Sequence, residues 1–147
     1  MSKNNDLISS HQLIDSEDPI VIFDSGKIDQ DFILSFANAV QDFNPIHCNH
    51  KFAISKGLPN TAIHGIMSIS FIEHALQCIF GTEWIVSSIE GRFINMLYVG
   101  QSIKGWCRII QLAEHNAIFK MKVKFWVKAD NDVRVLVGKS ELIRRDK

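Results

Sequence analysis

The spacing of apolar residues predicts a helical first half and a strand-rich second half. After a short apolar run, PIVIFDSGK from Pro19, which predicts a strand, apolar positions recur every three to four residues through about residue 40. The residues predicted to share one helix face are Phe32, Ile33, Phe36, Ala37 and Val40. Asp29 precedes this run and is a suitable N-cap, because its carboxylate can accept hydrogen bonds from unpaired first-turn amides. The pattern predicts a helix that ends just before Asp42.

A proline-containing connector follows this helix. Asn44 precedes Pro45, and the proline ring disfavours the α conformation for the residue before it, so the helix must stop here. Asn49 can cap a second, shorter helix, and Gly57 can close it by tolerating a left-handed conformation. The segment between the two helices, DFNPIH, is therefore expected to be a bent loop.

Residues 65–80 predict a longer helix with a broad apolar surface, ended by Gly81. Most of its circumference is expected to be buried. It has about the length of a membrane span, but Glu73 and His74 would be costly in hydrocarbon, so a core helix is predicted and no membrane segment. Glu73 and His74 must then be paired or reach a pocket or an interface, because an unpaired buried charge is expensive.

Beyond Gly81 the apolar period changes to two. Residues 84–94, 103–112, 117–128 and 133–143 predict four long strands with short antiparallel connections. The economical arrangement for such strands beside one apolar helix is an α+β fold in which the sheet curls around the helix. The exposed sheet edges favour a homodimer.

Composition narrows the class of protein. The 147 residues fit one domain, and we expect a flexible segment at 1–15 and a single domain at 16–147. Sixteen basic and sixteen acidic residues give no net charge, which disfavours nucleic acid as a partner. The N-terminal sequence does not look like a secretory signal, and three widely spaced cysteines indicate reduced thiols, so the cytosol is the expected location.

Titratable chemistry is concentrated at two places in the first half. Asp42 and His47 lie five residues apart across the proline-bent connector, where a carboxylate and an imidazole can act on one water molecule as general base and acid. The alternative is a helix-terminating Asx turn beside a surface histidine. His64 and Gly65 lie at the predicted start of the long helix, where free N–H groups can polarise a carbonyl oxygen. The alternative there is an ordinary helix entry into a crowded core.

Two further patterns concern a metal site and a basic surface. His47, Cys48, His50 and His64 do not form the close-spaced pairs typical of a tetrahedral metal site, so no metal and no cofactor are predicted. The strand FKMKVKFWVK alternates apolar and mainly lysine positions, which is typical of one buried and one solvated face. A basic surface for the phosphates of coenzyme A, or for an acidic carrier protein, is the alternative.

DFNPIH followed by IHG, with His64 twenty-two positions after Asp42, resembles the MaoC-like (R)-specific enoyl-CoA hydratases of the hot-dog fold. FANAVQDFNPIH and GRFINMLYVGQSI extend the resemblance over most of the chain from about Ile20. It implies addition of water to a trans-2-enoyl thioester of coenzyme A or acyl carrier protein, or the reverse. Asp42 and His47 would be catalytic, the Gly65 amide would bind the thioester oxygen, and Asn44 and His64 would contribute to substrate binding. A homodimer is implied.

The chain departs from the family pattern at several positions. They are Gln41, Met96, Leu97 and Gln101, and Glu73, which lies near a serine of some relatives. If a carboxylate at that place shared a pocket with Asp42, repulsion between the like charges would raise the pKa of one of the two carboxyl groups. Two other functions are compatible with the sequence: a hot-dog thioesterase using Glu73 or Asp42, and a non-catalytic acyl-binding module.

Overall fold

The computed structural model describes residues 18–145, so the segment expected to be flexible, 1–15, lies outside the described residues. The elements are β1 (Ile20–Lys27), α2 (Gln30–Val40), α3 (Pro45–Cys48), α4 (His50–Ser55), α5 (Gly65–Phe80), β2 (Ile85–Phe93), β3 (Ser102–His115), β4 (Ile118–Ala129) and β5 (Arg134–Arg145). All strands pair antiparallel in one sheet of order β1-β3-β4-β5-β2.

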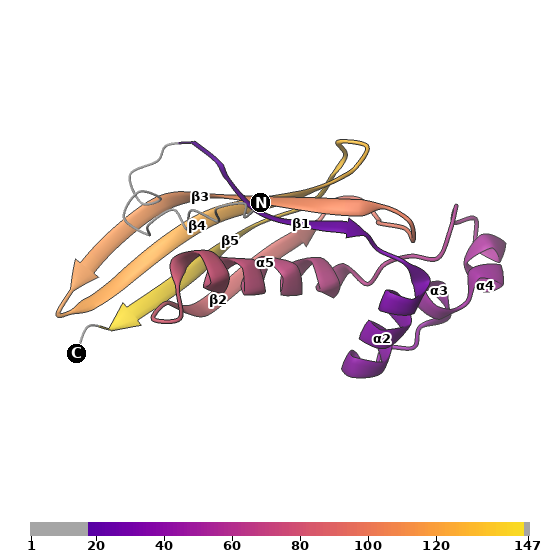
Figure 1. Cartoon of the computed structure of the whole chain (residues 1–147), viewed down its shortest axis with the longest axis horizontal. Coiled ribbons are helices and arrows are strands. Elements are labelled where there is room, and N and C mark those ends of the chain that lie inside the picture. The colour runs from indigo at the N-terminus through magenta and orange to yellow at the C-terminus, as the bar shows by residue number, and fades with distance from the viewer. Residues whose placement is uncertain (1–17, 146–147) are drawn as a thin grey trace, which may run out of the picture.

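The sheet curves around α5, which lies along its concave face, while α2, α3 and α4 gather beyond the start of α5 (Figure 1). Helix α5 contacts both edge strands, β1 and β2, as a helix inside a curled sheet must. The predicted hot-dog arrangement, a central helix wrapped by an antiparallel sheet, is therefore confirmed.

One predicted connection is wrong. Short turns do join β3 to β4 and β4 to β5, but β2 pairs with β5 at the opposite side of the sheet from β3. Residues 94–101 therefore cross from one side of the sheet to the other. A period of two predicts strands but not their neighbours, because pairing depends on contacts between distant segments.

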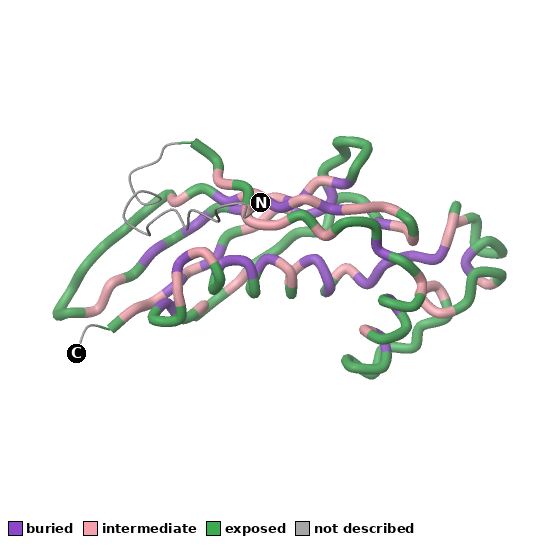
Figure 2. The backbone as a smooth tube through the Cα atoms, viewed as in Figure 1, coloured by how far each residue is buried: buried purple, intermediate pink, exposed green. Residues whose placement is uncertain are grey.

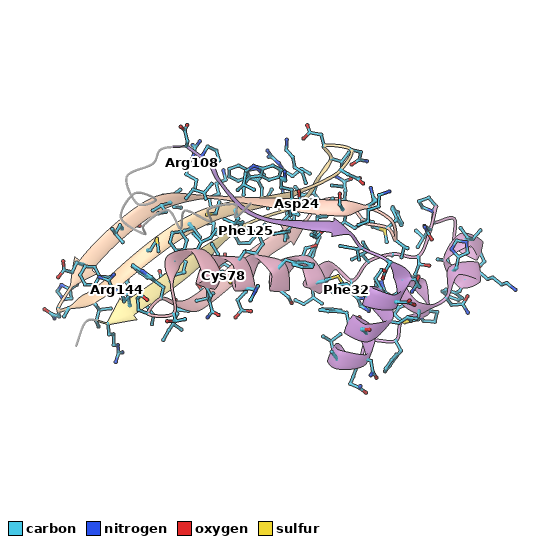
Figure 3. All side chains as sticks on the ribbon, viewed as in Figure 1. Asp24, Phe32, Cys78, Arg108, Phe125 and Arg144 are labelled. Atoms are coloured by element: carbon cyan, nitrogen blue, oxygen red, sulfur yellow. The ribbon has the colours of Figure 1, made fainter. Side chains whose placement is uncertain are left out.

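The core lies between the inner face of the sheet and α5. The predicted alternation of β4 is confirmed, since Met121, Val123, Phe125 and Val127 are fully buried. Phe125 lies between sheet and helix (Figure 3). Gly138 of β5 allows this close packing, because a Cβ there would clash with the Glu90 carbonyl oxygen and the Phe125 ring. Helix α5 contributes Ile72, Leu76 and Phe80.

Helix α5 starts and ends where the sequence predicts, but its circumference is less buried than expected. Met67, Ser68, Ile72, Ala75, Leu76 and Phe80 are buried, whereas the opposite side is exposed (Figure 2). Glu73 and His74 lie on this exposed side, so neither is a buried charge that needs a partner or a pocket. Polar residues that recur at the helical period keep this side of the helix in solvent, although apolar residues lie next to them. Within residues 18–145, no helix has the length and apolar character needed to cross a membrane.

The face of α2 is also shifted from the prediction. Asp29 caps the helix as expected, its Oδ1 accepting a hydrogen bond of 2.8 Å from the Phe32 amide. The buried residues are Ile33 and Ala37, while Phe32 and Val40 are exposed. A strict period of four drifts around a helix of 3.6 residues per turn, so the ends of the predicted stripe leave the core.

Candidate active site

The connector after α2 is bent by two successive caps. Gln41 adopts the left-handed conformation, with φ of 58°, and the Asp42 amide donates to the Ala37 carbonyl at 3.0 Å. The Asp42 carboxylate then accepts from the Asn44 amide at 3.2 Å, and the Asn44 side chain accepts from the Ile46 amide at 3.2 Å. These bonds fix the reversal of the chain and leave the Asp42 side chain half exposed.

His47 lies on α3, a single helical turn where the sequence predicts a loop. Pro45 is tolerated in the first turn because its missing N–H would have no helical partner there. The His47 Nδ1 lies 2.8 Å from the Ala62 carbonyl oxygen. Since a carbonyl can only accept, Nδ1 donates its hydrogen, and in the neutral ring Nε2 is left with a free lone pair. His47 is therefore held in the tautomer that a general base requires.

His64 is buried and supports both residues. Its Nε2 donates to the main-chain carbonyl oxygen of Asp42 at 3.0 Å and lies 3.9 Å from the Asp42 carboxylate. Its ring stacks on the His47 ring, with centroids 3.9 Å apart and planes 25° apart. The other nitrogen, Nδ1, is buried and makes no hydrogen bond among the described residues. His64 thus links the connector to the start of α5.

The pKa of His47 lies below its ordinary value. Burial is the main cause, because removing the ring from water penalises the imidazolium. The hydrogen bond to Ala62 and the Asp42 carboxylate act in the opposite direction, and His64 adds to the lowering. A neutral imidazole at physiological pH is the form that can accept a proton from water.

A pocket of about 270 Å³ opens at the start of α5. Its lining residues are His47, Ile63, Gly65, Ser68, Phe93, Ile94, Asn95, Met96, Leu97 and Val135. The Gly65 amide makes no hydrogen bond within residues 18–145, and the N-cap, His64, provides no side-chain bond to the first turn. Phe93 packs directly over Gly65, since a Cβ added there would lie 3.0 Å from its ring.

Three of the five residues expected at the site converge, and His47 joins them to the pocket. A carboxylate oxygen of Asp42 and one ring nitrogen each of His47 and His64 lie within 4.8 Å of one another. His47 and Gly65 both line the pocket. Asp42, Asn44 and His64 do not line it: Asp42 lies beside His47, Asn44 caps α3, and His64 is buried behind the His47 ring. Glu73 is exposed and lines neither place.

Residues 93–97 form much of the pocket and were not singled out as site residues from the sequence. Phe93 ends β2 and residues 94–97 begin the crossing segment, and the mainly apolar FINML gives no local sign of its position in space. Ser68 was also missed, although its place three residues after Gly65 puts both on one side of the helix. That spacing was the available signal.

Asp42, His47 and His64 could be drawn as a metal site, but their geometry does not favour one. His64 Nε2 is occupied by the Asp42 carbonyl, and His47 Nδ1 by the Ala62 carbonyl. The lone pairs of imidazole nitrogens lie in the ring planes, and the two rings are stacked nearly parallel, so their lone pairs do not converge on a common point. The same bonds suit acid–base chemistry.

The fold defines a protein of the hot-dog class, and its pocket lies at the start of the central helix. The sequence pattern of the MaoC like domain matches residues 14–133, and the chain belongs to this family. Its structure is similar to the unliganded R-hydratase PhaJ1 from Pseudomonas aeruginosa, with a TM-score of 0.82, 19% identity, and 94% of this chain and 86% of that chain covered. It is also similar to the (R)-hydratase from A. caviae involved in PHA biosynthesis, with a TM-score of 0.79 and 17% identity. That match covers 92% of this chain and 99% of the other.

Two sequence relatives come from Arabidopsis thaliana. The peroxisomal enoyl-CoA hydratase 2 is 31% identical over 64 residues, which cover 42% of this chain and 21% of the relative. The mitochondrial 3-hydroxyacyl-[acyl-carrier-protein] dehydratase is 27% identical over 114 residues, covering 76% of this chain and 67% of the relative. The chain therefore spans about a fifth of the first relative and two thirds of the second.

Proposed function

We propose that this protein is an (R)-specific enoyl thioester hydratase, or in the reverse direction a 3-hydroxyacyl thioester dehydratase. The observation that carries the proposal is the position of His47. It belongs to the cluster with Asp42 and also lines the pocket into which the amide of Gly65 opens. The names of the relatives support the same reaction class.

In the proposed reaction, a water molecule held between Asp42 and His47 is deprotonated while its oxygen bonds to C3 of the enoyl thioester. Negative charge then develops on the thioester oxygen, where the free Gly65 amide at the start of α5 stabilises it. A proton from the same pair of side chains is delivered to C2, so that both atoms of water add from one side. The product is the (R)-3-hydroxyacyl thioester, and dehydration follows the same steps backwards.

The substrate carrier is proposed to be coenzyme A or an acyl carrier protein. No cofactor is required, because the groups that move protons belong to the chain. Residues 16–147 are proposed to form one MaoC-like domain acting in the cytosol. The three free cysteines fit a reducing compartment, and cell fractionation tests the location.

The reaction is tested by the ultraviolet absorbance of the enoyl thioester. With crotonyl-CoA and longer enoyl-CoA substrates, absorbance should fall on addition of the protein, and chiral analysis should give the (R) product. Asp42→Asn and His47→Gln should each abolish turnover while leaving circular dichroism unchanged. His50→Gln is the matched control, because His50 is an exposed imidazole on α4 that pairs with Asn60 outside the pocket. No turnover of any substrate by folded protein would refute the proposal.

We further propose a homodimer through the β2 edge. Strand β2 ends the sheet, and Ile85 at the start of this edge strand is 58% exposed. An exposed apolar residue on an unpaired strand edge favours coverage by a second copy. Light scattering should give twice the chain mass of 16.7 kDa, and Ile85→Lys should lower it. A wild-type protein that remains monomeric at micromolar concentration would contradict this.

A further inference from the structure

Ser68 carries a hydroxyl that lines the pocket without a hydrogen-bond partner. The residue is only 2% exposed, and its hydroxyl forms no hydrogen bond within residues 18–145. The hydroxyl is not among the polar atoms that are fully shielded without a partner, so it remains accessible from the pocket that the residue lines.

Other serines of the chain do form such bonds. The buried Ser140 donates to the Ser88 carbonyl at 2.8 Å, and Ser70, two residues further along α5, donates to the Ile66 carbonyl at 3.2 Å. A helical serine can bond to the carbonyl four residues back, which for Ser68 is that of His64. That carbonyl accepts from the Met67 amide at 3.0 Å, and the Ser68 hydroxyl makes no hydrogen bond to it. The Ser68 hydroxyl is thus left available to a pocket ligand.

The position of Ser68 relative to Gly65 indicates which part of a ligand it meets. The two residues are three apart on the same side of α5, which places Ser68 about 4.5 Å further along the helix axis. They are the only residues of α5 among those that line the pocket; the next inward residues, Ile72 and Leu76, are fully buried in the core. A thioester bound with its oxygen at Gly65 would bring the carbons just beyond the reacting double bond beside Ser68.

The size and lining of the pocket restrict the ligand further. At about 270 Å³ it lies at the small end of ligand pockets, which start near 300 Å³. Most of the wall is apolar, and Asn95, another polar lining residue, already donates through its side chain to the Arg134 carbonyl at 2.8 Å. The Ser68 hydroxyl is therefore a localised polar group in a short apolar pocket.

We propose that Ser68 makes this site selective for short acyl thioesters that carry a hydrogen-bonding oxygen on the carbon following the double bond, such as a hydroxyl at C4. The inference rests on the proposed hydratase function, because it assumes a thioester bound at Gly65. A purely apolar chain at the same place would leave the Ser68 hydroxyl unpaired, which disfavours binding.

A matched pair of substrates tests the selectivity. The coenzyme A thioesters of 4-hydroxybut-2-enoic acid and pent-2-enoic acid differ only by a hydroxyl in place of a methyl group. Wild-type protein should have a kcat/KM about tenfold higher for the hydroxylated substrate, and Ser68→Ala should lower this ratio about tenfold. Ser70→Ala, on the exposed side of the same helix, should leave the ratio unchanged.

Failure of this inference is distinguishable from failure of the proposed reaction. The saturated thioesters 4-hydroxybutanoyl-CoA and pentanoyl-CoA cannot be hydrated, and calorimetry measures their binding whether or not the protein is a catalyst. A preference for the hydroxylated ligand that Ser68→Ala abolishes would support the role of Ser68 even without turnover. Equal binding of the two ligands, or a preference that persists in Ser68→Ala, would overturn it, as would a long unbranched acyl chain being the best substrate.

Discussion

Replacing Gly65 with alanine separates the role of the helix start from that of protein stability. The backbone of Gly65 does not need a positive φ, so the replacement adds a methyl group without backbone strain. The added Cβ would meet three carbons of the Phe93 ring at 3.0, 3.2 and 3.2 Å, closer than ordinary van der Waals contact. Phe93 is half exposed and can move outward by the few tenths of an ångström required.

The expected change in stability is small because two effects oppose each other. Alanine is favoured over glycine within a helix by about 0.5–1 kcal/mol, and less at the first position. Overpacking in a closed core costs about 1–3 kcal/mol, but Phe93 borders solvent, so the lower end applies. We expect the free energy of unfolding in urea to change by less than about 1 kcal/mol.

The expected change in activity is large. Because Phe93 and Gly65 both line the pocket, the methyl group points into it, beside the amide that we propose binds the thioester oxygen. Loss of one donor to a developing oxyanion costs about a factor of 10² to 10³ in kcat, or roughly 3–4 kcal/mol. Gly65→Ala should therefore lower kcat for crotonyl-CoA by about two orders of magnitude, with Ser70→Ala unchanged.

The double variant Gly65→Ala, Phe93→Ala tests whether the loss of activity comes from the blocked amide or from a displaced Phe93 ring. Removing the ring relieves the contact but leaves the methyl group next to the amide, so kcat should stay low. If Gly65→Ala alone keeps kcat within threefold of wild type, the amide is not the oxyanion donor. If the double variant recovers full activity, the position of the Phe93 ring matters rather than access to the amide, and the reasoning fails.

Three further predictions concern stability and reactivity. Because folding lowers the pKa of His47, the unfolded state binds more protons, and the free energy of unfolding should decrease as pH falls through about 6.5. Urea titrations at pH 7.5 and 5.5 measure this decrease, which should be smaller in His47→Gln. Asp29→Ala removes the cap of α2 and should lower the midpoint of urea unfolding by the equivalent of about 1 kcal/mol, whereas an unchanged midpoint would show that the cap contributes little. Burial raises the pKa of the Cys107 thiol to about 12, so peptide mapping should find Cys107 unmodified by iodoacetamide in the folded protein and modified only in denaturant.

The local elements of this protein are determined by neighbouring residues and could be predicted. Asp29 begins α2, Gly65 and Gly81 lie at the limits of α5, and the alternation of β4 separates its buried and solvated faces. These features depend on periodicity and capping within a few residues of each other. The wrap of the sheet around one apolar helix also followed, since so few long elements leave few ways to bury their apolar faces.

The composition of the pocket was decided by the tertiary structure. His64 was predicted at a helix start, but its bond to the Asp42 carbonyl and its burial against His47 join segments twenty-two residues apart. Residues 93–97 reach the same place because β2 pairs with β5 rather than with β3, which follows it in sequence. The period of apolar residues in the sequence identifies which face of a strand or helix is apolar. Which faces meet depends on how all the elements pack together. That packing positions Ser68 and Phe93 beside Gly65.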